Sequence, residues 1–158
     1  MIDLCKEIKK LNMKWLSQCS VKIGEDDELL KIAAESGCTA LSFGLESISK
    51  ESLDSMQKSW ADPNEYGRLL KNISRHGIDL STEMVVGADG DTLESIKATA
   101  KFIEDNKIVV PRFYILTPIP GTVFYKEMER KIGYTTKISI PTMVQKPYTY
   151  LKTCPQKS

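Results

Sequence analysis

The sequence predicts an α/β fold with about four parallel strand–helix units, and two observations favour this class. Three apolar segments, residues 40–47, 84–92 and 115–122, each stop at glycine, a carboxylate or proline, and a helix-like stretch follows each of them. Their spacing suits repeated strand–helix units, which form parallel sheets with right-handed crossovers. Because the strands of such a series end at one rim, where α/β barrels bind small molecules, we expect the functional residues at that rim.

The composition is that of an ordinary globular protein. A length of 158 residues favours one domain, and hydrophobic residues make up 41% and charged residues 27% of the chain. The formal net charge of +1 gives no field that would attract nucleic acid. Apolar stretches stay short of the roughly 18 residues of a membrane span, and charges interrupt the first ten residues, unlike a secretory signal. We therefore expect a cytoplasmic protein that binds neither nucleic acid nor membrane.

The four cysteines, Cys5, Cys19, Cys38 and Cys154, lie too far apart in sequence for a local zinc knuckle or redox pair. Cys19 and Cys38 fall in or beside apolar segments, as is typical of buried thiols. Without a secretory signal, a disulfide framework is not expected.

The first elements alternate between helix and strand. Apolar residues at helical spacing predict a helix over residues 3–11, and residues 14–20 form the first strand. Asp26 is the expected N-cap of a helix over residues 27–36, and Gly37 suits the position after its end.

The middle of the chain continues this alternation with a second strand and two helices. Residues 40–44 form the strand, and a short helix over 50–57 follows with Ser49 as its N-cap. The next helix begins at Asp62-Pro63 and closes at Gly77.

The last elements are two further strand–helix pairs. Residues 80–86 are the third strand, and Asp91 with Glu94 predicts a capping box for the helix after it. Residues 112–116 are the fourth strand, and a helix over 122–130 ends the regular part. Four strands are too few to close a barrel, so the chain is either an open α/β sheet or an arc of a larger barrel.

Candidate functional residues follow the predicted strand ends. A carboxylate at Glu46, next to Ser47, can accept hydrogen bonds from a vicinal diol such as a ribose, or it can instead cap a turn or pair with a lysine. Gly87 and Gly90 let backbone approach a ligand closely, or form a tight turn before a capped helix. Pro118 with its neighbours stiffens the loop after the fourth strand, as a pocket wall or as a connector.

Three polar residues complete the candidates. Gln18 ends the first strand and Lys58 lies beyond the second, so either can reach a ligand carboxylate at the rim, although an isolated lysine is more often solvated. His76, the single histidine, falls at a helix C-terminus, where the helix dipole favours its positively charged form. We therefore expect it to have a structural role. Hydrolase triads and histidine metal sites therefore have little support.

Six motifs occur in the order seen in radical S-adenosylmethionine (radical SAM) proteins, and the chain most resembles their B12-binding-domain class. The resemblance runs from about Leu4 to Met128. It rests on WLSQCS (15–20), DDELLKIAAESGC (26–38), FGLES (43–47), SLDSMQK (52–58), VVGADGDT (85–92) and TPIPGT (117–122).

This resemblance implies a partial (β/α)6 TIM-like barrel, with residues 1–130 as the C-terminal portion of the radical SAM core and residues 131–158 as an irregular tail. Family members bind S-adenosylmethionine and a [4Fe-4S] cluster, and some use cobalamin; the cofactors carry the difficult chemistry. By similarity, Glu46 with Ser47 holds the ribose hydroxyls and Gln18 and Lys58 contact the methionine portion. The adenine border is carried over to Val86, Gly87, Thr117 and Pro118.

The chain departs from the family pattern at the cluster. The C-x3-C-x2-C loop is absent, as are the acidic glycine-containing loop of the family's second barrel strand and a cobalamin-binding domain. The sequence therefore predicts a fragment or degenerate remnant of a radical SAM enzyme that ligates neither cluster nor cobalamin and is inactive alone.

Two alternatives belong to other classes. The first is a binding protein without chemistry, whose unpaired first strand pairs with a partner chain that supplies the missing barrel strands. The second, with least support, is a small α/β enzyme that uses Glu46 with Lys22 or Lys58.

Overall fold

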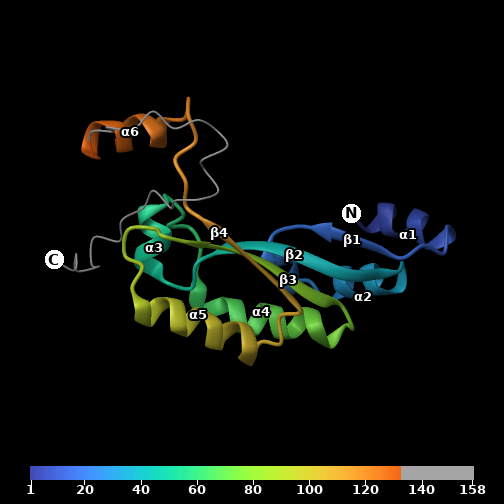
Figure 1. The fold of residues 1–158 in the computed structure, drawn as a ribbon. Helices are drawn as coiled ribbons and strands as arrows, with labels where there is room; N and C mark the ends of the chain where they lie inside the picture. Colours follow the sequence, from blue (N-terminus) through green and yellow to red (C-terminus); the bar gives the residue numbers. More distant parts are fainter. Residues whose placement is uncertain (133–158) are drawn as a thin grey trace.

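The computed structural model describes residues 1–132 and shows a parallel sheet with helices connecting its strands (Figure 1). The four strands lie side by side in the order of the sequence, and every neighbouring pair is parallel. They are β1 (Trp15–Gln18), β2 (Cys38–Glu46), β3 (Asp79–Val86) and β4 (Val110–Ile115). The predicted α/β class with four parallel strand–helix units is confirmed.

The helices also follow the expected order. They are α1 (Ile2–Lys10), the 3-10 helix η1 (Val21–Glu25), α2 (Asp27–Glu35), α3 (Lys50–Ser55), α4 (Pro63–Arg75), α5 (Leu93–Asp105) and α6 (Val123–Ile132). Most boundaries differ from the predicted ones by one or two residues, and η1 was not predicted. The first two residues of the expected irregular tail, 131 and 132, belong to α6, and the rest of the tail lies outside the described residues.

The predicted N-caps of three helices are confirmed. Asp26 accepts a hydrogen bond from the backbone N–H of Leu29 at 2.9 Å, and Ser49 and Asp62 cap α3 and α4 in the same way. Gly37 has a φ of 98°, in the left-handed region that favours glycine after a helix end.

The capping box predicted at Asp91 and Glu94 is wrong by one residue. Thr92 is the N-cap of α5 and exchanges hydrogen bonds with Ser95, so a Thr–Ser pair forms the box. Asp91 is free for another role because the adjacent threonine hydroxyl caps the helix.

One face of the sheet is covered by helices and contains the core. Alternate residues of β2, namely Leu41, Phe43 and Leu45, point to this side and are at most 2% exposed. They pack with buried residues of α2, α3 and α4, and Figure 1 shows α2, α4 and α5 on this side. Burial of such side chains is the main favourable term in folding.

The opposite face of the sheet carries mostly polar or small residues. Ser42, Gly44, Ser81, Glu83 and Arg112 lie on it, because each alternates with a residue that faces the helices. In Figure 1, α6 stands on this side, away from the layer formed by α4 and α5. The site described below lies where this open face meets the carboxyl ends of the strands.

A β-bulge interrupts the pairing of β2 with β3 close to that end. Gly44 pairs with Glu83, whereas Glu46, two residues later, pairs with Met84, only one residue later on β3. Such an extra residue bends the strand and redirects the side chains that follow. The bulge therefore determines how Glu46 leaves the sheet.

Candidate functional site: a cavity at the carboxyl ends of the strands

A cavity of about 670 Å³ lies at the carboxyl ends of the strands. Its walls come from β2, β3 and the segments after α3 and β4, through Glu46, Lys58, Val85, Gly87 and Leu116, and side chains of α6 line the remaining side. This volume is typical of small-molecule sites, and the strand ends of α/β sheets are where such sites form.

Glu46 is one of three acidic residues that line this cavity, together with Asp89 and Glu127. It is the last residue of β2, and its φ of 65° places a non-glycine residue in the left-handed region. Such backbone costs about 1–2 kcal/mol and occurs disproportionately at functional sites. The bulge and this conformation together turn the carboxylate from the sheet toward the cavity.

Lys58 is paired with Glu46. Its Nζ lies 2.5 Å from Oε1 of Glu46, and the two side chains are 34% and 19% exposed, respectively. The backbone N–H of Lys58 donates to the carbonyl of Leu53 at 2.8 Å, which fixes the lysine directly after α3. Of the two alternatives to a ribose contact, the lysine pair is therefore present, and the carboxylate is held beside a positive charge.

A buried tyrosine lies behind this acidic group. Tyr66 is 4% exposed, and its hydroxyl donates to the carbonyl of Leu45 at 3.4 Å. Burial raises the pKa of Tyr66 to about 12, and the negative charge of Glu46 contributes to the rise. The tyrosine therefore stays neutral and supports the strand end from the core side.

The loop after β3 is closed by a buried carboxylate. Asp91 is 4% exposed, and its Oδ2 accepts hydrogen bonds from the backbone N–H groups of Gly87 at 2.7 Å and Ala88 at 3.1 Å. Its Oδ1 accepts from the fully buried hydroxyl of Ser52 at 2.6 Å. Asp91 thus ties the loop to α3, and Gly87, with a φ of 94°, lines the cavity between them.

The structure brings some of the predicted site residues to the cavity itself. Glu46, Lys58 and Gly87 line it. Val86 lies in the chain between Val85 and Gly87, which both line the cavity.

Three of the other predicted residues lie beside the cavity, and one lies away from it. Thr117 and Pro118 follow Leu116, which lines it; the Thr117 hydroxyl donates to the carbonyl of Ile115, and Pro118 is buried. Ser47 is 5% exposed, and its hydroxyl accepts from the backbone N–H of Ser49 at 3.0 Å, within the turn that enters α3. Gln18 lies elsewhere, on the open face of the sheet.

Sequence reasoning missed part of the cavity wall. Gln57, with a φ of 60°, and Phe124 and Met128 of α6 also line the cavity. The helical spacing of Phe124 and Met128, four residues apart, was the available signal, because residues at that spacing share one face.

The donor set of the described residues does not fit a metal cluster. Within residues 1–132, no group of three or more His, Cys, Asp or Glu side chains is placed to hold a metal ion. Burial raises the pKa of Cys19, and it raises that of Cys38 to about 11, whereas iron–sulfur clusters need thiolates. Among residues 1–132, none of the helices has the combination of length and hydropathy that a membrane span requires.

The fold defines a class, a parallel α/β partial barrel, and this one has a cavity at its strand ends. The sequence profile of the Radical SAM superfamily matches residues 1–103, well over half of the chain, and the chain therefore belongs to the radical SAM superfamily. The family suggested by the six motifs is confirmed.

Curated relatives include bacteriochlorophyllide d C-12(1)-methyltransferase of Chlorobaculum tepidum, which is 32% identical over 133 residues, 84% of this chain and 29% of the relative. The C-8(2)-methyltransferase of the same organism is 30% identical over 85% of this chain and 29% of its own length. Hopanoid C-2 methylase of Rhodopseudomonas palustris is 25% identical over 72% of this chain and 22% of its own length. The chain thus spans less than a third of these relatives.

A solved structure shows the same fold. The radical S-adenosylmethionine methyltransferase TsrM from Kitasatospora setae, with cobalamin and a [4Fe-4S] cluster bound, superposes with a TM-score of 0.68 at 19% identity. The match covers 82% of this chain and 27% of TsrM. At this identity the similarity establishes the fold, and it agrees with four strands of a partial barrel.

Proposed function

We propose that residues 1–132 form the part of a radical SAM methyltransferase core that holds the adenosyl portion of S-adenosylmethionine. The observation that carries this proposal is the carboxylate of Glu46, which a bulge and a left-handed backbone turn into the 670 Å³ cavity at the strand ends. A carboxylate at such a strand end can accept hydrogen bonds from both hydroxyls of a ribose. All the curated relatives named above are methyl-transferring enzymes.

The remaining residues take supporting roles in this proposal. Lys58 keeps a positive charge at the carboxylate, within reach of the methionine carboxylate of the cofactor. The backbone at Val86 and Gly87 borders the adenine together with Thr117 and Pro118, and Asp91 holds the N–H group of Gly87. Ser47 holds the turn behind Glu46, and Gln18 approaches the methionine end from the open face.

When bound, S-adenosylmethionine supplies an activated methyl group or, after reductive cleavage, a 5′-deoxyadenosyl radical. The described residues do not fit the [4Fe-4S] cluster that cleavage requires, and they offer no observation that places cobalamin. The 158 residues are therefore a portion of a larger enzyme, a fragment or a remnant, and other segments would hold the cluster and cobalamin.

Isothermal titration calorimetry with S-adenosylhomocysteine, which needs no cluster, tests this proposal on the chain itself. Glu46→Gln is expected to weaken binding by about tenfold or more, because hydrogen bonds to a charged group contribute about 1.5–3 kcal/mol. Glu35→Gln is the matched control, since Glu35 also pairs with a lysine, Lys9, at 2.9 Å but on the exposed surface of α2. Equal loss in both variants, or no binding by the parent chain, would contradict the proposal.

A second candidate function is an interaction protein that completes its barrel with a partner chain. The observation that favours it is the exposure at the two edges of the described sheet, where Leu16 of β1 is 75% exposed and Ile115 of β4 is 51% exposed. Open edges with apolar side chains invite strand pairing. Sedimentation velocity over a range of concentrations tests the case of a second copy as partner: a purely monomeric chain argues against it, and Leu16→Lys is expected to reduce any self-association.

A further inference from the structure

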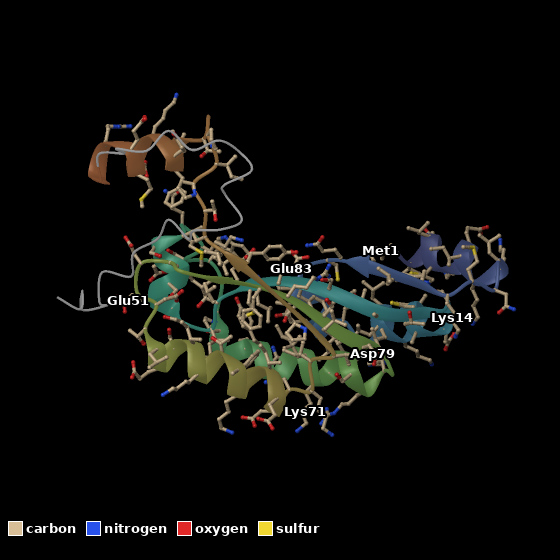
Figure 2. The ribbon with its side chains drawn as sticks, in the orientation of Figure 1. Met1, Lys14, Glu51, Lys71, Asp79 and Glu83 are labelled. Carbon is tan, nitrogen blue, oxygen red and sulfur yellow. The ribbon has the colours of Figure 1, made fainter. Side chains whose placement is uncertain are left out.

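A cluster of polar side chains crosses the open face of the sheet, below the cavity. It consists of Gln18 on β1, Ser42 on β2, Ser81 and Glu83 on β3, and Arg112 on β4. Figure 2 labels Glu83 on the sheet, on the side away from Lys71, which lies in the layer of helices. Members of four strands thus converge on a face that the described helices leave largely open.

Arg112 is fixed from beneath by two serines. Its Nη2 donates to Oγ of Ser42 at 2.8 Å and to Oγ of Ser81 at 3.0 Å, and these serines are 7% and 8% exposed. The Ser81 hydroxyl in turn donates to the carbonyl of Val110 at 3.1 Å. Both hydrogens of Nη2 are therefore used, and they point into the sheet.

The outer part of the guanidinium is left to meet a ligand. Among the described residues, every hydrogen bond of the Arg112 side chain starts from Nη2, so Nε and Nη1 keep their N–H groups. The side chain is 46% exposed. A guanidinium whose position is fixed and whose outer edge is open suits two parallel hydrogen bonds to a carboxylate.

Glu83 does not occupy this outer edge. Its Oε1 is 3.7 Å from Nη2 of Arg112, beyond hydrogen-bond distance, while its Oε2 accepts from Nε2 of Gln18 at 3.2 Å. The cluster thus carries one positive and one negative group side by side. Glu83 repels negative charge on a ligand, and this repulsion is larger for two charges than for one. A monocarboxylate is therefore favoured over a phosphate dianion.

The cluster lies next to the proposed cofactor cavity. Val85, which lines the cavity, follows Glu83 by two residues on the same face, a distance of about 6.6 Å along a strand. Gly44, which pairs with Glu83, is exposed and has no side chain. At this position, no side chain of β2 separates the cluster from the cavity. A molecule seated on Arg112 would therefore extend toward a cofactor in the cavity.

We propose that the outer edge of Arg112 binds the carboxylate of the acceptor molecule, with Glu83 accepting a hydrogen bond from a neighbouring donor group of the same molecule. This inference rests on the proposed function, because the proposed cofactor site makes this face the interior of a barrel. It assigns the acceptor to a chemical class, a molecule with a single carboxylate near a hydrogen-bond donor.

Nuclear magnetic resonance titration of the ¹⁵N-labelled chain tests the inference with benzoate, using benzamide as its uncharged counterpart. Benzoate is expected to shift the backbone amides of Ser81, Glu83 and Arg112 and to bind at least about tenfold more tightly than benzamide. Arg112→Gln removes this preference. Arg112→Lys keeps the positive charge but lacks the two parallel N–H donors of the guanidinium, so it should lose most of the preference for benzoate. Arg68→Gln, on the exposed side of α4, should keep that preference.

The outcomes separate this inference from the proposed function. Equal binding of benzoate and benzamide, or unchanged benzoate binding in a folded Arg112→Gln variant, overturns the carboxylate site. Glu46→Gln is expected to lose S-adenosylhomocysteine and keep the benzoate preference. Failure of the parent chain to bind S-adenosylhomocysteine, with the benzoate preference intact, contradicts the cofactor proposal and the assignment of the ligand as an acceptor, whereas the carboxylate site at Arg112 stands.

Discussion

Strands β2 and β4 have similar apolar side chains on the helix side of the sheet but very different surroundings. Phe43 of β2 is fully buried beneath the helices, whereas Phe113 of β4 is 49% exposed. All six residues of β4 are exposed, and α6, which follows it, stands on the other side of the sheet (Figure 1). The environment of a strand is thus decided by the elements that cover it, and its composition alone does not reveal which residues form the core.

The largest expected difference between the two strands is in stability. Phe43→Ala should lower the free energy of unfolding by about 3–5 kcal/mol, because it leaves a cavity in a packed core. Phe113→Ala should cost about 1 kcal/mol or less, since its side chain already contacts water. Urea denaturation of both variants measures these values, and similar losses would show that β4 is covered in solution.

A polar counterpart of Phe43 is Asp91, which is nearly as buried. Asp91→Ala should lower the free energy of unfolding by about 2–3 kcal/mol, because the N–H groups of Gly87 and Ala88 and the hydroxyl of Ser52 lose their acceptor. Hydrogen exchange should quicken first at Gly87 and Ala88. Glu94→Ala, at the exposed start of α5, serves as the control and should change stability little.

The smallest expected effect at neutral pH concerns the start of β2, because it appears only in alkaline solution. Burial raises the pKa of Cys38 to about 11, so above pH 9 the thiol ionises in the unfolded chain before it does in the folded one. The free energy of unfolding should therefore fall as the pH rises from 9 to 11. Cys38→Ala, followed by urea denaturation across this range, should give a flatter profile; an identical slope would mean that other groups, such as Tyr66, cause the decline.

The sequence predicted the order of elements and most helix starts because these signals are local. Asp26, Ser49 and the Asp62-Pro63 pair each satisfy backbone groups within three residues of themselves, so their role can be read without the fold. Glu46 was chosen as a candidate in the same way, from its place after an apolar strand, and it lines the cavity. Its pairing with Lys58 was one of the stated alternatives, and the structure shows that pairing.

What the sequence did not reveal depends on distant contacts. Arg112 meets Ser42 across 70 residues of chain, and Asp91 meets Ser52 across 39. The capping box was placed one residue early because Asp91 and Thr92 are both good caps, and only the contact with Ser52 decides between them. The bulge at Gly44 is likewise invisible, since it exists only relative to β3.

The left-handed backbone at Glu46 and Gln57 has a consequence for the evolvability of the cavity, since both residues line it. Glycine or asparagine adopts this conformation at lower cost than either native residue. A library randomised at both positions and selected for thermal resistance alone should enrich those two residues at each. Selection for nucleoside binding should keep a carboxylate at position 46 and allow many residues at position 57. Comparing the two selections would show at which position the side chain is required and at which only the backbone conformation is.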